Sequence, residues 1–473
     1  MSAANPNSLS EHPRASTLRR TLARVLRAIS VAVGVAALAA AVLTPEATAE
    51  PMAPGCPDTV IPGAPLVPSA VGCWNAIAVQ TVRVATPYQV QGLIYVGYTQ
   101  AAVYDAVTKI KGRYVPYHDF QAPAGVDVEH ASPDAATAAA AYTMLTSPFL
   151  GLSASSQTGL STTYSNYIEA LGGLAAPRVA AGVQVGEAAA NDLIAERAGD
   201  RNESITFTPP AGLLTPGTWI FAPLPSVQSA QTPWVAVMKP FMLSSPLRFR
   251  SAPPPPLSSR AWAREYNEVK AYGSVDSTVR SPEETAIANF WNANAVNQSN
   301  QAFQDFAIAH RMDRVDAARM LAMGDLTDSD VEIACWDSKY YYAFWRPVTA
   351  IRNAASDGNP ATQPDPTWTP LLTTPNHPEY PSAHTCATGA ESEVYAAIVG
   401  SDWIDVTIRG SSDGTPNSWN VIQTFRRVDD LQQQVANARV WEGLHYRGST
   451  EAGLTLARKV AHWALRRYFL PAR

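Results

Sequence analysis

Long hydrophobic runs, clusters of basic residues and cysteines are all scarce in this chain of 473 residues. After residue 43 no stretch approaches the roughly twenty apolar residues that a membrane-spanning helix needs. The formal net charge is -5 and no basic run interrupts it, so a phosphate backbone finds little to bind. The sequence therefore predicts neither a nucleic-acid partner nor stable membrane insertion of the mature protein.

The one apolar run lies near the N-terminus, in residues 28–43. Five arginines, from Arg14 to Arg27, precede it, and Ala47-Thr48-Ala49 follows as a small-residue cleavage site. A membrane anchor is the alternative, but about sixteen residues are too few to span a bilayer. We predict that residues 1–49 are a cleaved signal peptide and that the mature protein is secreted or periplasmic.

The four cysteines form an even set, which permits disulfides in an exported chain. Cys56 and Cys73 close a short loop rich in Pro and Gly, and we predict that they pair. Cys335 and Cys386 lie beside two groups of polar residues, within residues 339–346 and 381–384. For that second pair, a disulfide and two buried free thiols remain equally open.

Alternation with the period of a strand is nearly absent, whereas apolar residues recur at helical spacing. The predicted helices span residues 74–110, 135–150, 156–171, 177–197, 260–271, 282–297, 301–309, 315–344, 384–399, 429–441 and 450–469. Prolines exclude long helices between residues 203 and 257. We predict an all-α fold of packed helical bundles joined by Pro-rich loops. An N-terminal half, residues 50–257, would precede a C-terminal bundle, residues 258–473, that carries the site.

The first group of polar residues is Lys339 and Arg346, seven residues apart. That spacing is nearly two helical turns, so both side chains would leave one face of a helix that Pro347 ends. The residues between them are mostly aromatic, which indicates burial. Because a buried cation needs a partner, a bound anion is expected here.

The second group, Pro381-Ser382-Ala383-His384, opens a predicted helix after a Pro-rich loop. Free N–H groups and the helix dipole favour an anion at such an end, and Ser382 adds a hydroxyl donor. A plain serine cap with an incidental histidine is the alternative.

The third group pairs Arg439 with His445, and Gly443 lies between them. On an unbroken helix the two side chains would diverge, so we expect a turn at the glycine that lets them converge. A divalent-metal site is a disfavoured alternative, because three nearby cations would repel the ion. Its ligands would be His377, Glu379, His384 and His445.

Taken in order, the three groups resemble the signature of the superfamily of vanadium-dependent haloperoxidases and type 2 phosphatidic acid phosphatases. That signature reads K-x6-RP, PSGH and SR-x5-H-x3-D. Residues 339–347 match the first motif without a change. Ala383 replaces Gly in the second, and in the third Ala438 replaces Ser while Ser449 replaces the final Asp. The resemblance covers about 110 residues directly.

The resemblance implies an oxyanion pocket that holds vanadate as the cofactor. His445 would ligate vanadium, and His384 would act as the acid–base. His377, five residues before Ser382, would line the halide entrance, as a histidine does in bromoperoxidases. The implied vanadate-binding residues are Lys339, Arg346, Ser382, Ala383 (through its backbone N–H) and Arg439.

In the phosphatase branch of the superfamily, the same pocket takes a phosphoester. His445 would then be a nucleophile that forms a phosphohistidine, and His384 would protonate the leaving group. Three features favour the peroxidase branch: the lack of transmembrane helices, the long helical half before the site, and the missing Asp at position 449. A non-catalytic oxyanion-binding module is a third possibility.

The sequence therefore predicts a haloperoxidase that uses hydrogen peroxide, a halide (bromide favoured) and a small organic substrate. A soluble acid phosphatase is the runner-up.

Overall fold

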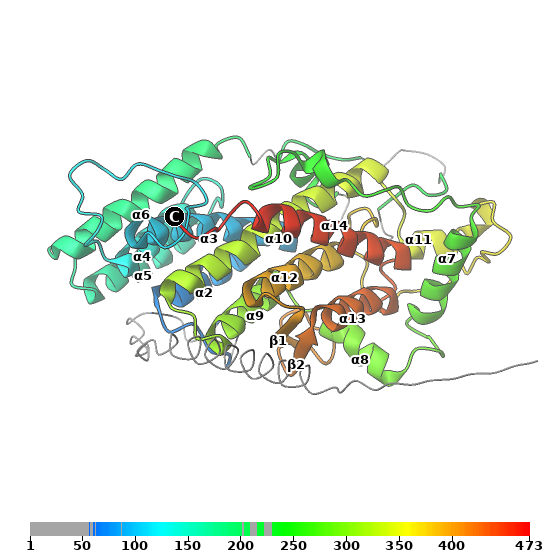
Figure 1. The fold of residues 1–473 in the computed structure, drawn as a ribbon. Coiled ribbons are helices and arrows are strands. Elements are labelled where there is room, and N and C mark those ends of the chain that lie inside the picture. Colours follow the sequence, from blue (N-terminus) through cyan, green and yellow to red (C-terminus); the bar gives the residue numbers. More distant parts are fainter. Residues whose placement is uncertain are drawn as a thin grey trace, which may run out of the picture. The chain divides into compact units, whose positions relative to one another are not determined.

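The computed structural model describes residue 56 and residues 60–61, 63–86, 88–200, 203–208, 215–221 and 229–473. The predicted signal peptide lies outside this part of the chain. Residues 50–473 form one compact unit of α-helices with a single two-stranded sheet among the described residues (Figure 1). The predicted all-α fold class is confirmed. No helix within the described ranges is long and apolar enough to cross a membrane.

In chain order, the α-helices are α2 (Ala70–Ala85), α3 (Gln89–Lys111), α4 (Pro133–Leu145), α5 (Ala154–Ala170), α6 (Pro177–Glu196), α7 (Arg260–Tyr272), α8 (Pro282–Phe290), α9 (Ala295–Ala309), α10 (Arg314–Tyr342), α11 (Pro347–Arg352), α12 (Ala383–Val399), α13 (Val428–Trp441) and α14 (Arg447–Leu465). Short 3-10 helices are η1 (Pro233–Val237), η2 (Pro246–Phe249) and η3 (Ala354–Ser356), and the strands are β1 (Trp403–Gly410) and β2 (Val421–Arg427).

Several predicted helices differ in extent from the observed ones, and two of them are broken where a single helix was expected. The one expected over residues 74–110 is divided between α2 and α3, because Thr86 precedes a proline and is extended, with φ -120° and ψ 131°. The one expected over residues 282–297 ends early at Phe290, and α9 begins anew after Asn294. The Asn294 side chain accepts two backbone N–H groups of the first turn of α9, so it acts as a helix cap.

The hairpin of β1 and β2 was not predicted from the sequence. The two strands pair in antiparallel register after an irregularity near Trp403. In β1 the side chains of Ile404, Val406 and Ile408 are buried and alternate with more exposed ones, which is the period of a half-buried strand. The signal was therefore present in the sequence, but it spans only one short segment.

Helix α10 is the central element, and it packs against α3, α12 and α14 (Figure 1). Most of its residues from Val315 to Lys339 are buried, including several acids, so its polar groups must find partners inside the protein. Asp330 does so by accepting the backbone N–H groups of Phe241, Met242 and Leu243, at 2.5–2.8 Å. These bonds hold the irregular η1–η2 segment against α10.

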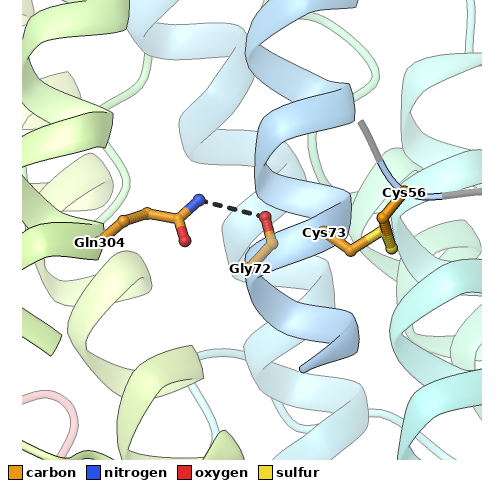
Figure 2. The surroundings of a disulfide bond; sticks show 4 residues. All are labelled: Cys56, Gly72, Cys73 and Gln304. Atoms are coloured by element: carbon orange, nitrogen blue, oxygen red, sulfur yellow. Dashed lines mark hydrogen bonds between the residues drawn. A yellow bond between two sulfur atoms is a disulfide. The ribbon is translucent and has the colours of Figure 1, made fainter. Parts of the chain in front are cut away.

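The N-terminal end of α2 is fixed from two sides, as Figure 2 shows. Gln304 of α9 donates from Nε2 to the carbonyl of Gly72 at 3.1 Å. On the other side, Cys73 forms a disulfide with Cys56, which confirms the predicted pair. Cys335 and Cys386 are buried free thiols, so of the two alternatives for that pair the structure has the unbridged one.

We expect the double variant Cys56→Ser/Cys73→Ser to lose about 3 kcal/mol of unfolding free energy, because its unfolded chain regains the freedom of a short closed loop. The two cysteines are 17 residues apart. Urea unfolding measures the difference. Dithiothreitol should destabilise the parent protein and leave the double variant unchanged; equal stability of parent and variant would contradict the prediction.

Candidate active site

Lys339 lies in the last turn of α10 and is fully buried. Its Nζ donates to the carbonyl oxygens of Pro378 (3.2 Å) and Glu379 (3.0 Å) and contacts that of Pro381. Burial lowers the pKa of Lys339. The ammonium group thus fixes the loop that leads into Ser382 and brings its positive charge to the start of α12.

Arg346 does not lie on the same helix as Lys339, so the expectation of one shared helix face is wrong. Helix α10 ends at Tyr342, and Ala343 adopts a left-handed conformation with φ 42°. Arg346 is the residue before α11, and Pro347 begins that helix rather than ending the previous one. A proline suits the first helical position because the N–H it lacks would have no partner there.

The Arg346 guanidinium nevertheless reaches the other two groups. Its Nε donates to the carbonyl of His377 at 3.0 Å, and one terminal nitrogen donates to that of Leu444 at 3.0 Å. The same nitrogen lies 3.3 Å from Nε2 of His445, and the other lies 3.0 Å from Nδ1 of His377. Burial lowers the pKa of Arg346 to about 10, so the group stays charged at neutral pH.

Ser382 stands at the N-cap position of α12, but its side chain makes no capping bond. Its Oγ is buried and has no hydrogen-bond partner among the described residues. Its backbone N–H donates to the carbonyl of Ser449 at 3.0 Å, which fixes the residue in place. The hydroxyl therefore does not serve the helix and is available to a bound oxyanion.

Arg439 and His445 converge through a turn at Gly443, as the sequence indicates. Gly443 has φ 77°, and a Cβ there would overlap the carbonyl oxygen of Gly273, so only glycine fits. Across this turn the His445 N–H donates to the Arg439 carbonyl at 3.2 Å. Arg439 is buried, with one terminal nitrogen 2.5 Å from a Glu442 oxygen in an ion pair, while its Nε has no hydrogen-bond partner among the described residues.

Glu379 is the functional residue that sequence reasoning missed. Its Oε1 lies 2.8 Å from Nδ1 of His445 and accepts the Tyr446 N–H at 3.1 Å, while its Oε2 accepts the Ser449 hydroxyl at 2.7 Å. Because the Arg346 guanidinium can only donate, Nε2 of His445 is the acceptor and Nδ1 carries the proton toward Glu379. Burial raises the pKa of Glu379 to about 7, and the bond from Ser449 opposes that rise.

This geometry corrects the interpretation of position 449. The carboxylate expected there comes from Glu379 instead, and Ser449 supports Glu379 rather than orienting His445 directly. The missing Asp therefore no longer disfavours a phosphohistidine nucleophile. A signal was available, because Glu379 lies three residues before Ser382, but from the sequence it was considered only as a divalent-metal ligand.

His384 lies in the first turn of α12 and faces a cavity of about 250 Å³. Burial, followed by Arg439, Lys339 and Arg346, lowers the pKa of His384 well below 6.5. The imidazole is thus neutral in the protein alone, and a bound oxyanion would counter part of that shift. The predicted site residues that line the cavity are His377, Ala383, His384, Arg439 and His445.

The cluster has the charge and donors that a tetrahedral oxyanion requires. The buried cations are Lys339, Arg346 and Arg439, and the buried carboxylates among them are those of Glu379 and Glu442. The Ser382 hydroxyl is a further donor. A metal cation fits poorly, because the described residues contain no group of three His, Cys, Asp or Glu side chains placed to hold one. The arrangement can bind an oxyanion and offer it one imidazole nitrogen.

Comparison with known proteins agrees with this chemistry. A family model described as the VCPO second helical-bundle domain matches residues 319–470. The vanadium chloroperoxidase of Curvularia inaequalis is 29% identical over 143 residues, which cover 25% of this chain and 23% of that enzyme. The match thus spans less than a quarter of the relative's length.

Solved structures resemble the chain over a larger part. The first bacterial vanadium-dependent iodoperoxidase aligns with a TM-score of 0.67 and 21% identity, covering 84% of this chain and 96% of that one. The holo form of a bacterial vanadium-dependent chloroperoxidase aligns with a TM-score of 0.64 and 19% identity, covering 80% and 91%. At these identities the likeness establishes the fold.

We expect Glu379→Gln to weaken orthovanadate binding by about 10–100-fold, because the hydrogen-bond partner of a ligating histidine fixes its orientation. Ser449→Ala should give a smaller loss, since it removes only one bond to the carboxylate. Equilibrium dialysis measures both affinities, and ¹⁵N shifts of the imidazole report whether Nδ1 still carries the proton. Unchanged affinity in a folded Glu379→Gln protein would contradict this role.

Proposed function

We propose that this protein is a vanadium-dependent haloperoxidase, because residues 319–470 match the VCPO second helical-bundle domain and the fold resembles those of solved vanadium-dependent haloperoxidases. It would oxidise a halide with hydrogen peroxide and pass the oxidised halogen to a small organic substrate. One observation carries the proposal: the Ser382 hydroxyl and the Arg439 Nε are buried donors without partners among the described residues, and Arg439, Ala383 and His445 line one cavity. Residues 1–49 would export the enzyme as a cleaved signal peptide.

Each residue of the pocket has a role toward vanadate that follows from its contacts. His445 would ligate the metal through Nε2, because its Nδ1 is held by Glu379. The Ser382 hydroxyl and the Ala383 N–H would donate to its oxygens. Bound vanadate supplies a Lewis acid that activates peroxide toward halide. The residues that would balance its negative charge are Lys339, Arg346 and Arg439.

His384 would act as the general acid–base. Burial and the nearby cations lower its pKa, so the imidazole is neutral in the protein alone and would be able to accept a proton from peroxide and return it to the leaving oxygen. The Lys339 Nζ is held in place by hydrogen bonds to the loop carbonyls, so its charge has a fixed position. It stabilises developing negative charge from a fixed position, which suits a site organised before the reaction begins.

A soluble acid phosphatase is the second candidate, and one observation favours it. The Glu379–His445 pair resembles the carboxylate–imidazole arrangement that orients a nucleophilic histidine. The discriminating experiment uses one preparation of the mature protein in two assays. With orthovanadate, bromide and peroxide it should brominate an activated phenol. Without vanadate it should hydrolyse p-nitrophenyl phosphate slowly or not at all, and the reverse result would favour the phosphatase.

We expect substitution of His445 and substitution of His384 to affect vanadate binding and turnover differently. His445→Ala should abolish vanadate binding, whereas His384→Ala should still bind vanadate and lose turnover by roughly 10²–10⁴-fold, the usual contribution of a general acid–base. Dialysis gives the affinity, and halogenation at saturating vanadate gives the turnover. If His445→Ala bound vanadate as tightly as the parent protein, the ligand assignment would be wrong.

We further propose that the enzyme prefers bromide and iodide to chloride, with His377 as the determinant. The His377 ring lines the cavity and lies 5.1 Å from the Trp336 ring. Its Nδ1 lies 3.0 Å from a terminal nitrogen of the Arg346 guanidinium. Burial and Arg346 lower the pKa of His377, so it is a neutral hydrogen-bonding group. Chloride is harder to oxidise than bromide and therefore demands stronger polarisation of the peroxide.

We expect His377→Phe to raise the ratio of chloride to bromide turnover several-fold, because the phenyl ring cannot accept a hydrogen bond from Arg346, whose freed guanidinium would polarise the peroxide more strongly. Steady-state monochlorodimedone halogenation with each halide measures the ratio. His377→Gln, which keeps a hydrogen-bonding group, is the matched control and should resemble the parent. A parent protein with comparable chloride and bromide turnover would refute the proposed preference.

A further inference from the structure

The cavity that reaches the oxyanion cluster has a second polar wall, which the proposed reaction does not use. Its volume is about 250 Å³, below the ~300–1,000 Å³ of typical drug-sized sites, so it suits a small molecule. Three aromatic or aliphatic side chains, Tyr88, Leu93 and Trp336, contribute an apolar surface. The second polar wall consists of Glu332, Glu391 and Ser299.

The helix register places the two carboxyl groups at one level. Glu332 lies seven residues before Lys339 on α10, and Glu391 lies seven residues after His384 on α12. Helix α10 ends where α12 begins, because Lys339 binds the loop that precedes α12. Seven residues correspond to about 10 Å along a helix and return nearly to the same face. Both carboxyl groups are therefore about two turns away from the oxyanion cluster, on the faces that line the cavity.

One of these carboxyl groups lacks a partner that a buried acid requires, and the other lies among further acids. Glu332 is only 2% exposed, and its Oε2 has no hydrogen-bond partner among the described residues. Glu391 accepts a bond from the Ser299 hydroxyl at 2.6 Å and also interacts with a third buried acid, Asp328. Burial raises the pKa of both Glu332 and Glu391. A ligand with N–H donors would satisfy the free oxygen and offset the repulsion between the acids.

We propose that Glu332 and Glu391 form a binding site for the ammonium group of a small aromatic amine, whose ring lies in the apolar part of the cavity toward the oxyanion cluster. An ammonium group beside these acids would favour their ionised form and counter the pKa rise that burial causes, whereas the buried cations at the other wall would repel it. The separation of about 10 Å, set by the helical rise, is long enough for an ammonium group, a short alkyl chain and a ring. That the ring is the halogenated group rests on the proposed function; binding of the amine does not.

The test is calorimetric binding of tyramine to the mature protein without vanadate, beside p-cresol, which has the same phenol ring but no ammonium group. We expect tyramine to bind at least about 10-fold more tightly than p-cresol. Glu332→Gln should remove most of that difference and leave p-cresol binding unchanged. Glu391→Gln is the second variant, so the proposal does not depend on one substitution folding. The matched control is Glu451→Gln, an exposed residue of α14 that should bind tyramine as the parent does.

Equal affinity for tyramine and p-cresol in the parent protein would overturn the proposal. So would unchanged tyramine affinity in Glu332→Gln and Glu391→Gln proteins that melt as the parent does. Vanadate affinity is measured separately by dialysis, so the two ideas fail independently. A protein that binds tyramine through these residues but not vanadate would retain this site and lose the proposed function.

Discussion

The buried guanidinium of Arg346 is the interaction on which the site depends. Its nitrogens reach the loop at His377, 31 residues further on, and the turn at Leu444, 98 residues further on, so one side chain joins three distant parts of the sequence. A buried cation is stable only when its donors and charge are matched. The carbonyl oxygens match the donors, whereas the charge is only partly matched by Glu379. The remaining positive potential is what an oxyanion would neutralise.

The sequence could predict which residues meet, because the three motifs keep their order and spacing. It could also predict the turn at Gly443, since a glycine between two residues that must converge is the natural place for the chain to reverse. It could not predict that Lys339 and Arg346 belong to different helices. Pro347 is compatible with the end of one helix or the start of another, and Ala343 gives no local warning of its left-handed conformation.

Glu379 shows a different limit of sequence reasoning. Its role arises from a contact across 66 positions, and its place three residues before Ser382 does not by itself identify His445 as the partner. The alternation of buried and exposed side chains in β1 was likewise difficult to recognise, because it spans one short segment that pairs only with β2. Local rules therefore gave the helices and the motif residues, while long-range contacts decided how each side chain is used.

The carboxylate at the imidazole comes from Glu379 and not from position 449, and this has a consequence for motif searches. A search pattern that demands aspartate four residues after the histidine would reject this chain, although a carboxylate is present at the imidazole. An aspartate at position 449 would face Glu379, because the serine hydroxyl at that position lies 2.7 Å from a carboxylate oxygen. Two buried carboxylates at that separation repel each other. An aspartate at position 449 would therefore be compatible with the site only if position 379 no longer carried a carboxylate.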